Sequence, residues 1–215
     1  MPNTDPATPN PPFPQWDMWF MDLVHAAIVR DLNRLADVTA DGVSDGAIAR
    51  WRFVSDVLQT HHDAEDQYLW PMVRDHAGDD PGVQPIMDAM ESEHAAIDPA
   101  IEQIGDALTA RDAEAASEQL RALATATAAH FEHEQTDAVP LLSRYVDPET
   151  RTTFEKSQRA GIPKSQQMLF FPWLTDGTDS KTAAAAWGVL PTPVRMMIKP
   201  IGSRKYAAFN AASFD

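Results

Sequence analysis

One sparse pattern occurs twice in this chain. Residues 61–71 read HHDAEDQYLWP and residues 130–140 read HFEHEQTDAVP, so that each copy has His first, Glu four residues later and Pro ten residues after the His. The two copies are 69 residues apart, and the same separation joins HAAI at 25–28 to HAAI at 94–97. We interpret this register as the duplication of a two-helix unit.

The spacing of apolar residues is helical along most of the chain, with almost no strand alternation. Long helices joined by short connections form antiparallel bundles. The sequence therefore predicts an all-α, up-down four-helix bundle in which the first two helices are repeated by the last two. The predicted helices cover residues 16–38, 44–76, 83–110 and 112–145. Two prolines inside them, Pro71 and Pro99, should kink or interrupt their helices because proline removes a backbone donor.

The chain divides into three predicted parts. Residues 1–15 are rich in proline and read as a disordered lead, and residues 16–146 form the bundle. Residues 147–215 form a C-terminal helical extension, which starts with Asp147 as N-cap and Pro148 at the first helical position.

The last segment, Lys181–Asp215, differs in charge from the rest. It has five basic residues and one acidic residue, a net charge of +4, so the remainder of the chain carries −19 of the total −15. Its short apolar stretches are expected to pack on the bundle as short helices, with Lys and Arg facing the acidic flank. The alternative is that this segment binds a partner or a membrane surface.

Composition excludes several classes of protein. The net charge of −15 argues against nucleic-acid binding, which needs clustered Lys and Arg. The absence of cysteine excludes disulfides, thiolate metal sites and thiol catalysis. The N-terminus does not resemble a secretory signal and no apolar run approaches the roughly 20 residues of a membrane span. A cytoplasmic protein is expected.

The duplicated pattern also predicts a metal site. His and Glu at positions i and i+4 lie on one face of a helix, so two helices each present such a pair and the other two each present one His. Pseudo-twofold halves would direct these side chains to a shared centre, where four imidazoles and two carboxylates suit a dinuclear iron or manganese site better than zinc. The predicted ligands are His25, His61, Glu65, His94, His130 and Glu134.

These residues resemble the hemerythrin-like, or HHE cation-binding, family over about residues 20–146. The resemblance rests on HAAI at His25, HHDAEDQYLWP, ESEHAAI at His94 and HFEHEQTDAVP. It implies a four-helix bundle that holds two non-haem iron ions joined by an oxo or hydroxo bridge. Members of the family bind dioxygen reversibly, sense oxygen or iron, or handle peroxide or nitric oxide.

The sequence departs from the oxygen-carrying members at two positions. Where they have a second His on the third helix, this chain has Asp98, and where their fourth helix has Asp, this chain has Gln135, with Glu134 serving instead. One imidazole is thus expected to be missing, which argues against stable reversible oxygen carriage and leaves room for either a substitute ligand or a more reactive open position.

Other polar side chains near the pattern have weaker expectations. His62 should lie on the bundle flank, about 100° around the helix from His61. Tyr68 could line the pocket or supply a phenolate, and His133 could support a ligand. Glu91 and Asp98 could accept the ring N–H of His94, whereas His76 should be a surface residue near a helix end.

Three functions remain open at this stage. The first is a redox enzyme, for example with catalase-like activity, that reacts with peroxide or another small oxidant. The second is a protein that binds, stores or senses dioxygen, nitric oxide or iron without turnover. The third is a metal-free bundle that acts through its basic tail. The sequence leaves open whether the protein is a monomer or a homodimer.

Overall fold

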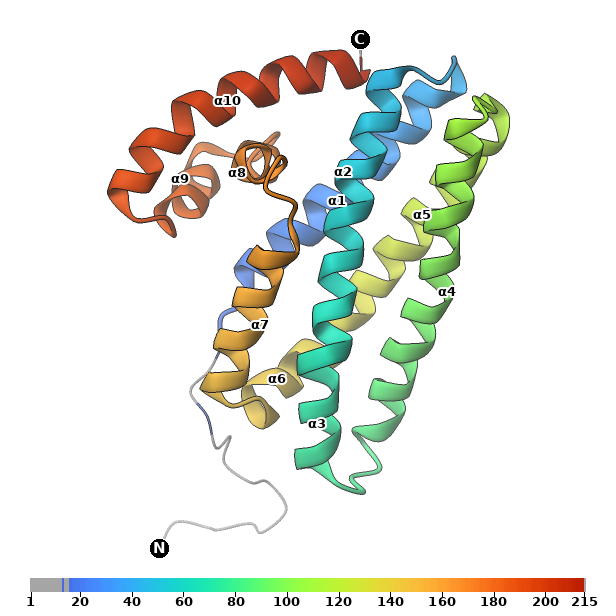
Figure 1. Ribbon diagram of the computed structural model, residues 1–215. Helices are drawn as coiled ribbons and strands as arrows, with labels where there is room; N and C mark the ends of the chain where they lie inside the picture. Colours follow the sequence, from blue (N-terminus) through green and yellow to red (C-terminus); the bar gives the residue numbers. More distant parts are fainter. Residues whose placement is uncertain (1–12, 14–15, 215) are drawn as a thin grey trace, which may run out of the picture.

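The structure is a computed structural model that describes Phe13 and residues 16–214. The described residues form an all-α fold, with no strand among them. Four helical rods make a bundle, and a C-terminal group of helices packs along one side of it (Figure 1). Apart from Phe13, the predicted disordered lead lies outside the described residues.

The bundle consists of four rods, two of which are single helices and two of which are composite. The rods are α1 (Trp19–Ala40); α2 (Asp45–Ala64), η1 (Glu65–Leu69) and α3 (Trp70–Ala77); α4 (Gln84–Thr109); and α5 (Ala113–His133), η2 (Glu134–Ala138) and α6 (Val139–Tyr145). Both α1 and α4 pack against α2 and against α5. Successive rods run in opposite directions in Figure 1, as short connections require. The prediction of an all-α helical bundle is confirmed.

The composite rods each contain a π-helical turn, η1 and η2, at equivalent places in the repeat. In each turn the N–H of the following residue bonds to the carbonyl of the Glu five residues earlier, Trp70 to Glu65 and Val139 to Glu134. A proline is the second residue of the α-helix that follows each turn and cannot make the usual bond to the residue four before it. The duplicated prolines therefore coincide with a local widening of the helix, and each widening begins at the Glu of the pattern.

Pro99 behaves differently from Pro71. Helix α4 continues through Pro99 without interruption. Pro99 is exposed, and so is Ala95, whose carbonyl loses its partner and can bond to water instead. The structure thus contradicts an interruption at Pro99, whereas the α-helix is interrupted before Pro71 as predicted.

The C-terminal extension is helical and packs on the bundle, as predicted, but its last helix is 23 residues long and continues through Pro200, so the prediction of short helices is wrong there. It comprises α7 (Pro148–Gly161), α8 (Gln167–Leu174), α9 (Ser180–Gly188) and α10 (Thr192–Phe214). Asp147 is the N-cap of α7 and accepts bonds from the backbone of Glu149 and Thr150. Helix α7 packs against α2 and η1, and α10 packs against α2 and α8.

A buried ion pair anchors this extension to the bundle. Arg50 Nε donates to Asp31 Oδ2 at 2.5 Å, and neither side chain is exposed. The Trp173 indole of α8 donates to the same Asp31 oxygen at 2.9 Å, and Arg50 Nη2 donates to the Tyr206 hydroxyl of α10 at 2.8 Å. The Arg50 guanidinium also lies 5.0 Å from the centre of the Tyr206 ring. The extension thus completes a polar cluster that the bundle alone would leave half-paired.

The charges at this interface are the reverse of those predicted. Arg30 of α1 donates to the carbonyls of Trp173 and Asp176 at 3.0 and 2.6 Å, and Arg34 pairs with the Asp176 carboxylate at 2.6 Å. Within residues 16–214, no ion pair joins a Lys or Arg from 181 onward to a bundle carboxylate. Arginines of the bundle bind acceptors of the extension because those acceptors include free carbonyls at the end of α8. The predicted contact of basic tail residues with the acidic flank is wrong.

No helix in the described part of the chain is long and apolar enough to cross a membrane.

Candidate metal centre

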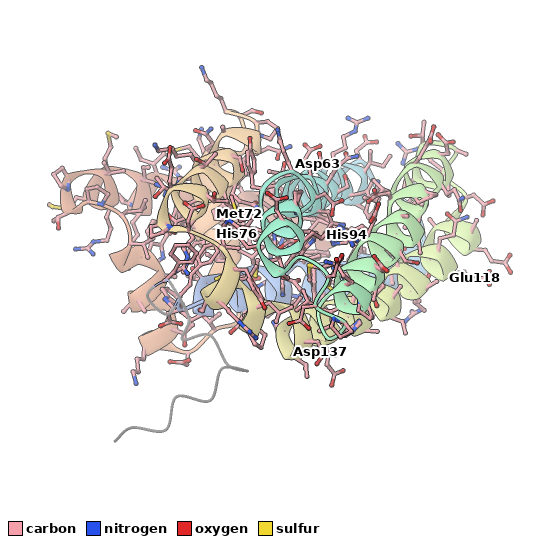
Figure 2. All side chains as sticks on the ribbon, turned by 90° about the horizontal axis from the view of Figure 1, so that it is seen from below. Asp63, Met72, His76, His94, Glu118 and Asp137 are labelled. Carbon is pink, nitrogen blue, oxygen red and sulfur yellow. The ribbon has the colours of Figure 1, made fainter. Side chains whose placement is uncertain are left out.

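All six predicted ligands lie in one buried layer across the bundle. Each is at most 3% exposed. Apolar clusters border the layer on both sides along the rods; in α4, for example, Met90 belongs to one cluster, Ile97 to the other, and His94 lies between them. Figure 2, which views the bundle from below, shows His94 between α4 and the α2–α3 rod, with Glu118 and Asp137 at the outer surface. The sequence register thus brings these side chains together.

Four of these side chains form the first half of the layer. His25 Nε2 lies 2.6 Å from His61 Nε2 and 3.4 Å from Glu134 Oε2. His61 Nε2 lies 3.2 Å from Glu65 Oε1 in the same rod. One atom from each of the four residues lies within 4.8 Å of the others. Two imidazoles and two carboxylates therefore face a common point.

Three imidazoles form the second half. His94 Nε2 lies 3.0 Å from His130 Nε2 and 3.7 Å from Glu65 Oε2. The His62 ring stacks on the His94 ring, with 4.0 Å between centroids, and lies edge-on to the His130 ring. The three rings each offer a nitrogen within 4.8 Å of the others. Glu65 reaches toward both halves.

The position of His62 corrects the sequence analysis, which placed it on the bundle flank. It is 1% exposed. The reason is that α2 packs against both α1 and α4, so two adjacent residues about 100° apart can each face a different neighbour inside the bundle. His61 faces His25 of α1, and His62 faces His94 of α4.

Several buried polar atoms of this layer lack hydrogen-bond partners, and a bound cation would pair with them. All four carboxylate oxygens of Glu65 and Glu134 are buried without a hydrogen-bond partner among the described residues, and so are both ring nitrogens of His62. Leaving buried charged groups unpaired is costly. Imidazole nitrogens and carboxylate oxygens together suit iron or manganese. The donor set therefore fits a pair of such metal ions.

Burial determines the protonation of the layer. Burial raises the pKa of Glu134 to about 8, and burial together with the neighbouring Glu134 raises the pKa of Glu65 well above its usual range. Burial likewise lowers the pKa of His130 to about 4 and that of His25 well below its ordinary value. Without a cation the layer thus favours neutral acids and neutral imidazoles, and a metal ion would replace the acid protons.

The outward nitrogens of two imidazoles contact carboxylates. His94 Nδ1 lies 2.9 Å from Asp66 Oδ1, and His130 Nδ1 lies 2.8 Å from Glu93 Oε2. The second oxygen of Glu93 bonds to His133 Nδ1 at 2.7 Å. His133 therefore supports a predicted ligand indirectly, as the sequence suggested, whereas Asp66 and Glu93 were missed.

The outward nitrogens of the other two predicted imidazole ligands contact amides. Gln135 Nε2 lies 3.2 Å from His25 Nδ1, and Gln158 Nε2 lies 3.4 Å from His61 Nδ1. The amide of Gln135 can turn its oxygen toward the ring N–H of His25. The Gln158 amide nitrogen also donates to the His61 carbonyl at 3.3 Å and so fixes the side chain beside the ring. Gln158 comes from α7, which no spacing argument connects to the bundle pattern.

Several accessory residues named from the sequence lie elsewhere. Tyr68 lines a surface pocket against α7, because the π turn shifts the residues after Glu65 off the His61 stripe. Glu91 pairs with Arg74 at 3.0 Å, not with His94.

Asp98 also does not bond to His94. It lies 3.8 Å from His62 Nδ1. His76 is exposed near the end of α3, as predicted, and its Nδ1 lies 2.6 Å from the carbonyl oxygen of Tyr145.

A comparison with known families agrees with this geometry. Residues 18–142, more than half of the chain, match the family model described as hemerythrin HHE cation binding domain. Neither a curated protein nor a solved structure matches the chain.

Proposed function

Since the chain belongs to the hemerythrin HHE cation-binding family, we propose that it holds two iron ions and binds or reacts with small oxidants such as peroxide, dioxygen or nitric oxide. The observation that carries this proposal is the buried layer in which the oxygens of Glu65 and Glu134 lack partners while imidazole nitrogens converge on them. The oxo or hydroxo bridge expected from the resemblance stays a prediction.

The side chains divide naturally between two metal positions. His62, His94 and His130 would hold one ion, and His25 with His61 would hold the other. Glu65 and Glu134 lie where each could contact both. Bound iron would supply redox chemistry and a position for a small ligand. The protein's own part is to orient the imidazoles, exclude bulk water and present the two carboxyl groups, whose protons a bound cation would replace.

The repeat identifies the side on which a small ligand would bind. The residue equivalent to His62 in the second copy is Phe131, which stacks on His25 at 3.7 Å as His62 stacks on His94. Phenylalanine has no ligand atom, so the His25 side has one imidazole fewer. A surface pocket of about 530 Å³ lies on the same side, and its lining includes Gln135, the residue that contacts His25.

His62 changes the balance between the two candidate functions. The expected loss of an imidazole favoured a reactive enzyme, but His62 supplies an imidazole that the spacing did not assign. Five imidazoles and two carboxylates favour the alternative, reversible binding of a small ligand, more than the sequence did. Both functions need the same metal centre.

Iron quantification with optical spectra tests the proposal. Purified protein is loaded with ferrous iron, and spectra are recorded without oxygen, under oxygen and after peroxide. Two irons per chain and a spectrum that changes with oxygen are expected. A change that deoxygenation reverses supports binding, and consumption of peroxide with repeated turnover supports an enzyme.

The contradicting result is equally plain. Well-folded protein that keeps much less than one iron per chain under iron-rich conditions would reject the metal centre. Phe131→His should hold iron but bind nitric oxide less readily, since it adds an imidazole where the small ligand is expected.

A further inference from the structure

The two copies of the repeat have diverged at one pair of equivalent residues that touch the candidate ligands. Asp66 follows Glu65 in η1, and Gln135 follows Glu134 in η2, with the repeat separation of 69 residues between them. Each reaches across to the lone His of another rod, Asp66 to His94 and Gln135 to His25. The contacts are thus copies of one another, but one uses a carboxylate and the other an amide.

Both contacts are made to the same ring nitrogen, Nδ1. His94 Nδ1 lies 2.9 Å from Asp66 Oδ1, and His25 Nδ1 lies 3.2 Å from the amide of Gln135. Both imidazoles direct Nε2 inward, toward His130 and His61 respectively. The two contacts therefore differ in the chemical group that supports the ring, a carboxylate or an amide, and not in the position of that group.

In each half of the layer a second imidazole contacts the same type of group as the first, a carboxylate in one half and an amide in the other. His130 of the three-imidazole half contacts the carboxylate of Glu93, whereas His61 of the other half contacts the amide of Gln158. His62 has Asp98 as its nearest carboxylate, at 3.8 Å. The outward hydrogen-bond partners of His94 and His130 are thus carboxylates, those of His25 and His61 are amides, and His62 has no such partner among the described residues.

This difference has a defined consequence for metal binding. A carboxylate that accepts the Nδ1–H of an imidazole increases the electron density on the opposite nitrogen and makes it a stronger ligand. A neutral amide orients the ring without this effect. The Asp66 side chain is 44% exposed, and its carboxylate contacts the buried ring from the surface of the bundle.

We propose that Asp66 and Gln135 are positioning residues that make the two metal positions unequal, so that the His94 side fills first and the His25 side fills second and more weakly. This inference rests on the proposed metal centre and adds the order of loading. The weaker position is the one beside Phe131 and the surface pocket, where the small ligand is expected.

Isosteric exchange of the two residues tests the inference. Asp66→Asn and Gln135→Glu each change charge with little change of shape, and anaerobic titration with ferrous iron, followed by calorimetry with a competing chelator, reports both steps. The unaltered chain should show two separated binding steps. Asp66→Asn should weaken the first step by about 10- to 100-fold, the usual effect of losing such a support. Gln135→Glu should strengthen the second step by about 10-fold, a gain that a merely structural role would not produce.

Control substitutions come from exposed positions close to each residue. Asp63→Asn removes a charge near Asp66, and Thr136→Glu adds a charge in η2 beside Gln135, at positions with no hydrogen bond to an imidazole among the described residues. Neither should shift either step beyond a small electrostatic change, and thermal unfolding of the iron-free variants confirms that each is folded.

Three outcomes decide the matter. Separated steps that move as described support the inference. Two equal steps in the unaltered chain, or shifts equal to those of the controls, overturn it while leaving the metal centre intact. Absence of iron binding in the unaltered chain overturns the proposed function and the inference with it.

Discussion

The molecule has two buried polar clusters. They differ in whether their polar groups have hydrogen-bond and ion-pair partners within the cluster. Under the C-terminal extension, Asp31 has Arg50 and Trp173 as partners, and Arg50 also contacts Tyr206. In the His and Glu layer, by contrast, the oxygens of two fully buried carboxylates have no hydrogen-bond partner among the described residues.

The difference indicates separate roles for equally buried charge. A cluster whose charges pair with one another fixes how the extension docks without a bound cation, although Arg50 Nη1 has no hydrogen-bond partner among the described residues. A cluster of imidazoles and carboxyl groups gains charge balance for ionised carboxylates only when a cation binds from outside. Removing one member of the paired cluster should therefore destabilise the fold directly. Removing one member of the His and Glu layer should instead reduce metal binding.

The largest effect is expected in the cluster under the C-terminal extension, which contains Asp31, Arg50, Trp173 and Tyr206. Arg50→Met should lower the free energy of unfolding by about 3–5 kcal/mol, because it removes the fully buried partner of Asp31 and leaves that carboxylate only the partly exposed Arg30 and the Trp173 indole. Urea denaturation measures the loss, and the double variant with Asp31→Leu should recover much of it. A loss of less than about 1 kcal/mol, typical of an exposed pair, would contradict the assigned role.

Removing a proposed metal ligand should act through iron binding and not through the fold. His61→Ala or Glu134→Ala should abolish or halve bound iron and remove the stabilisation that iron gives, about 4 kcal/mol when free metal is about 1,000 times its dissociation constant. Iron content and thermal unfolding with and without iron measure this. His76→Ala, which changes an exposed histidine near the end of α3, should leave iron content and the stabilisation by iron unchanged, even where loss of its contact with the Tyr145 carbonyl lowers stability in both forms equally. Equal iron loss in all three variants would contradict the assignment.

A smaller effect is expected where the extension meets α2. A Cβ at Gly46 would overlap the backbone carbonyl of Ala212 in α10. Gly46→Ala should therefore cost about 1–3 kcal/mol of stability, as overpacking usually does, without changing iron content. Gly188→Ala, where an added Cβ meets nothing within 4 Å, is the matched control. Equal stability of the two variants would mean that the docking of α10 is not rigid.

Much of this arrangement could be predicted from the sequence, because the repeat sets the spacing of the His and Glu residues along the helices. Two helices with His and Glu one turn apart, in a fixed register with two further His, leave few ways to place six side chains. His62 could not be placed, since the direction of a residue next to a ligand depends on which rods flank its helix. Tyr68 was misplaced because a π turn changes the phase of the residues after it. Gln158 gave no signal, because only the packing of α7 brings it near His61.

The pH dependence of stability follows from the shifted groups. The pKa of Glu134 is raised to about 8, so as pH rises toward 8 the unfolded chain ionises this group more readily, and the iron-free protein loses stability. The pKa of His130 is lowered to about 4, so the opposite loss, on acidification, occurs below the ordinary pKa of histidine near 6.5. Above about pH 6.5 only the carboxylate effect remains.

Thermal unfolding of iron-free and iron-loaded protein from pH 6.5 to 8 tests the central claim most directly. The iron-free protein should lose stability across this range, the iron-loaded protein should not, and the gap between them should widen. Glu134→Gln should reduce the loss in the iron-free form, because it replaces the titrating carboxyl with a neutral group of the same shape. A gap that is independent of pH, with Glu134→Gln unfolding like the unaltered iron-free chain, would contradict the account that these buried carboxylates await a metal.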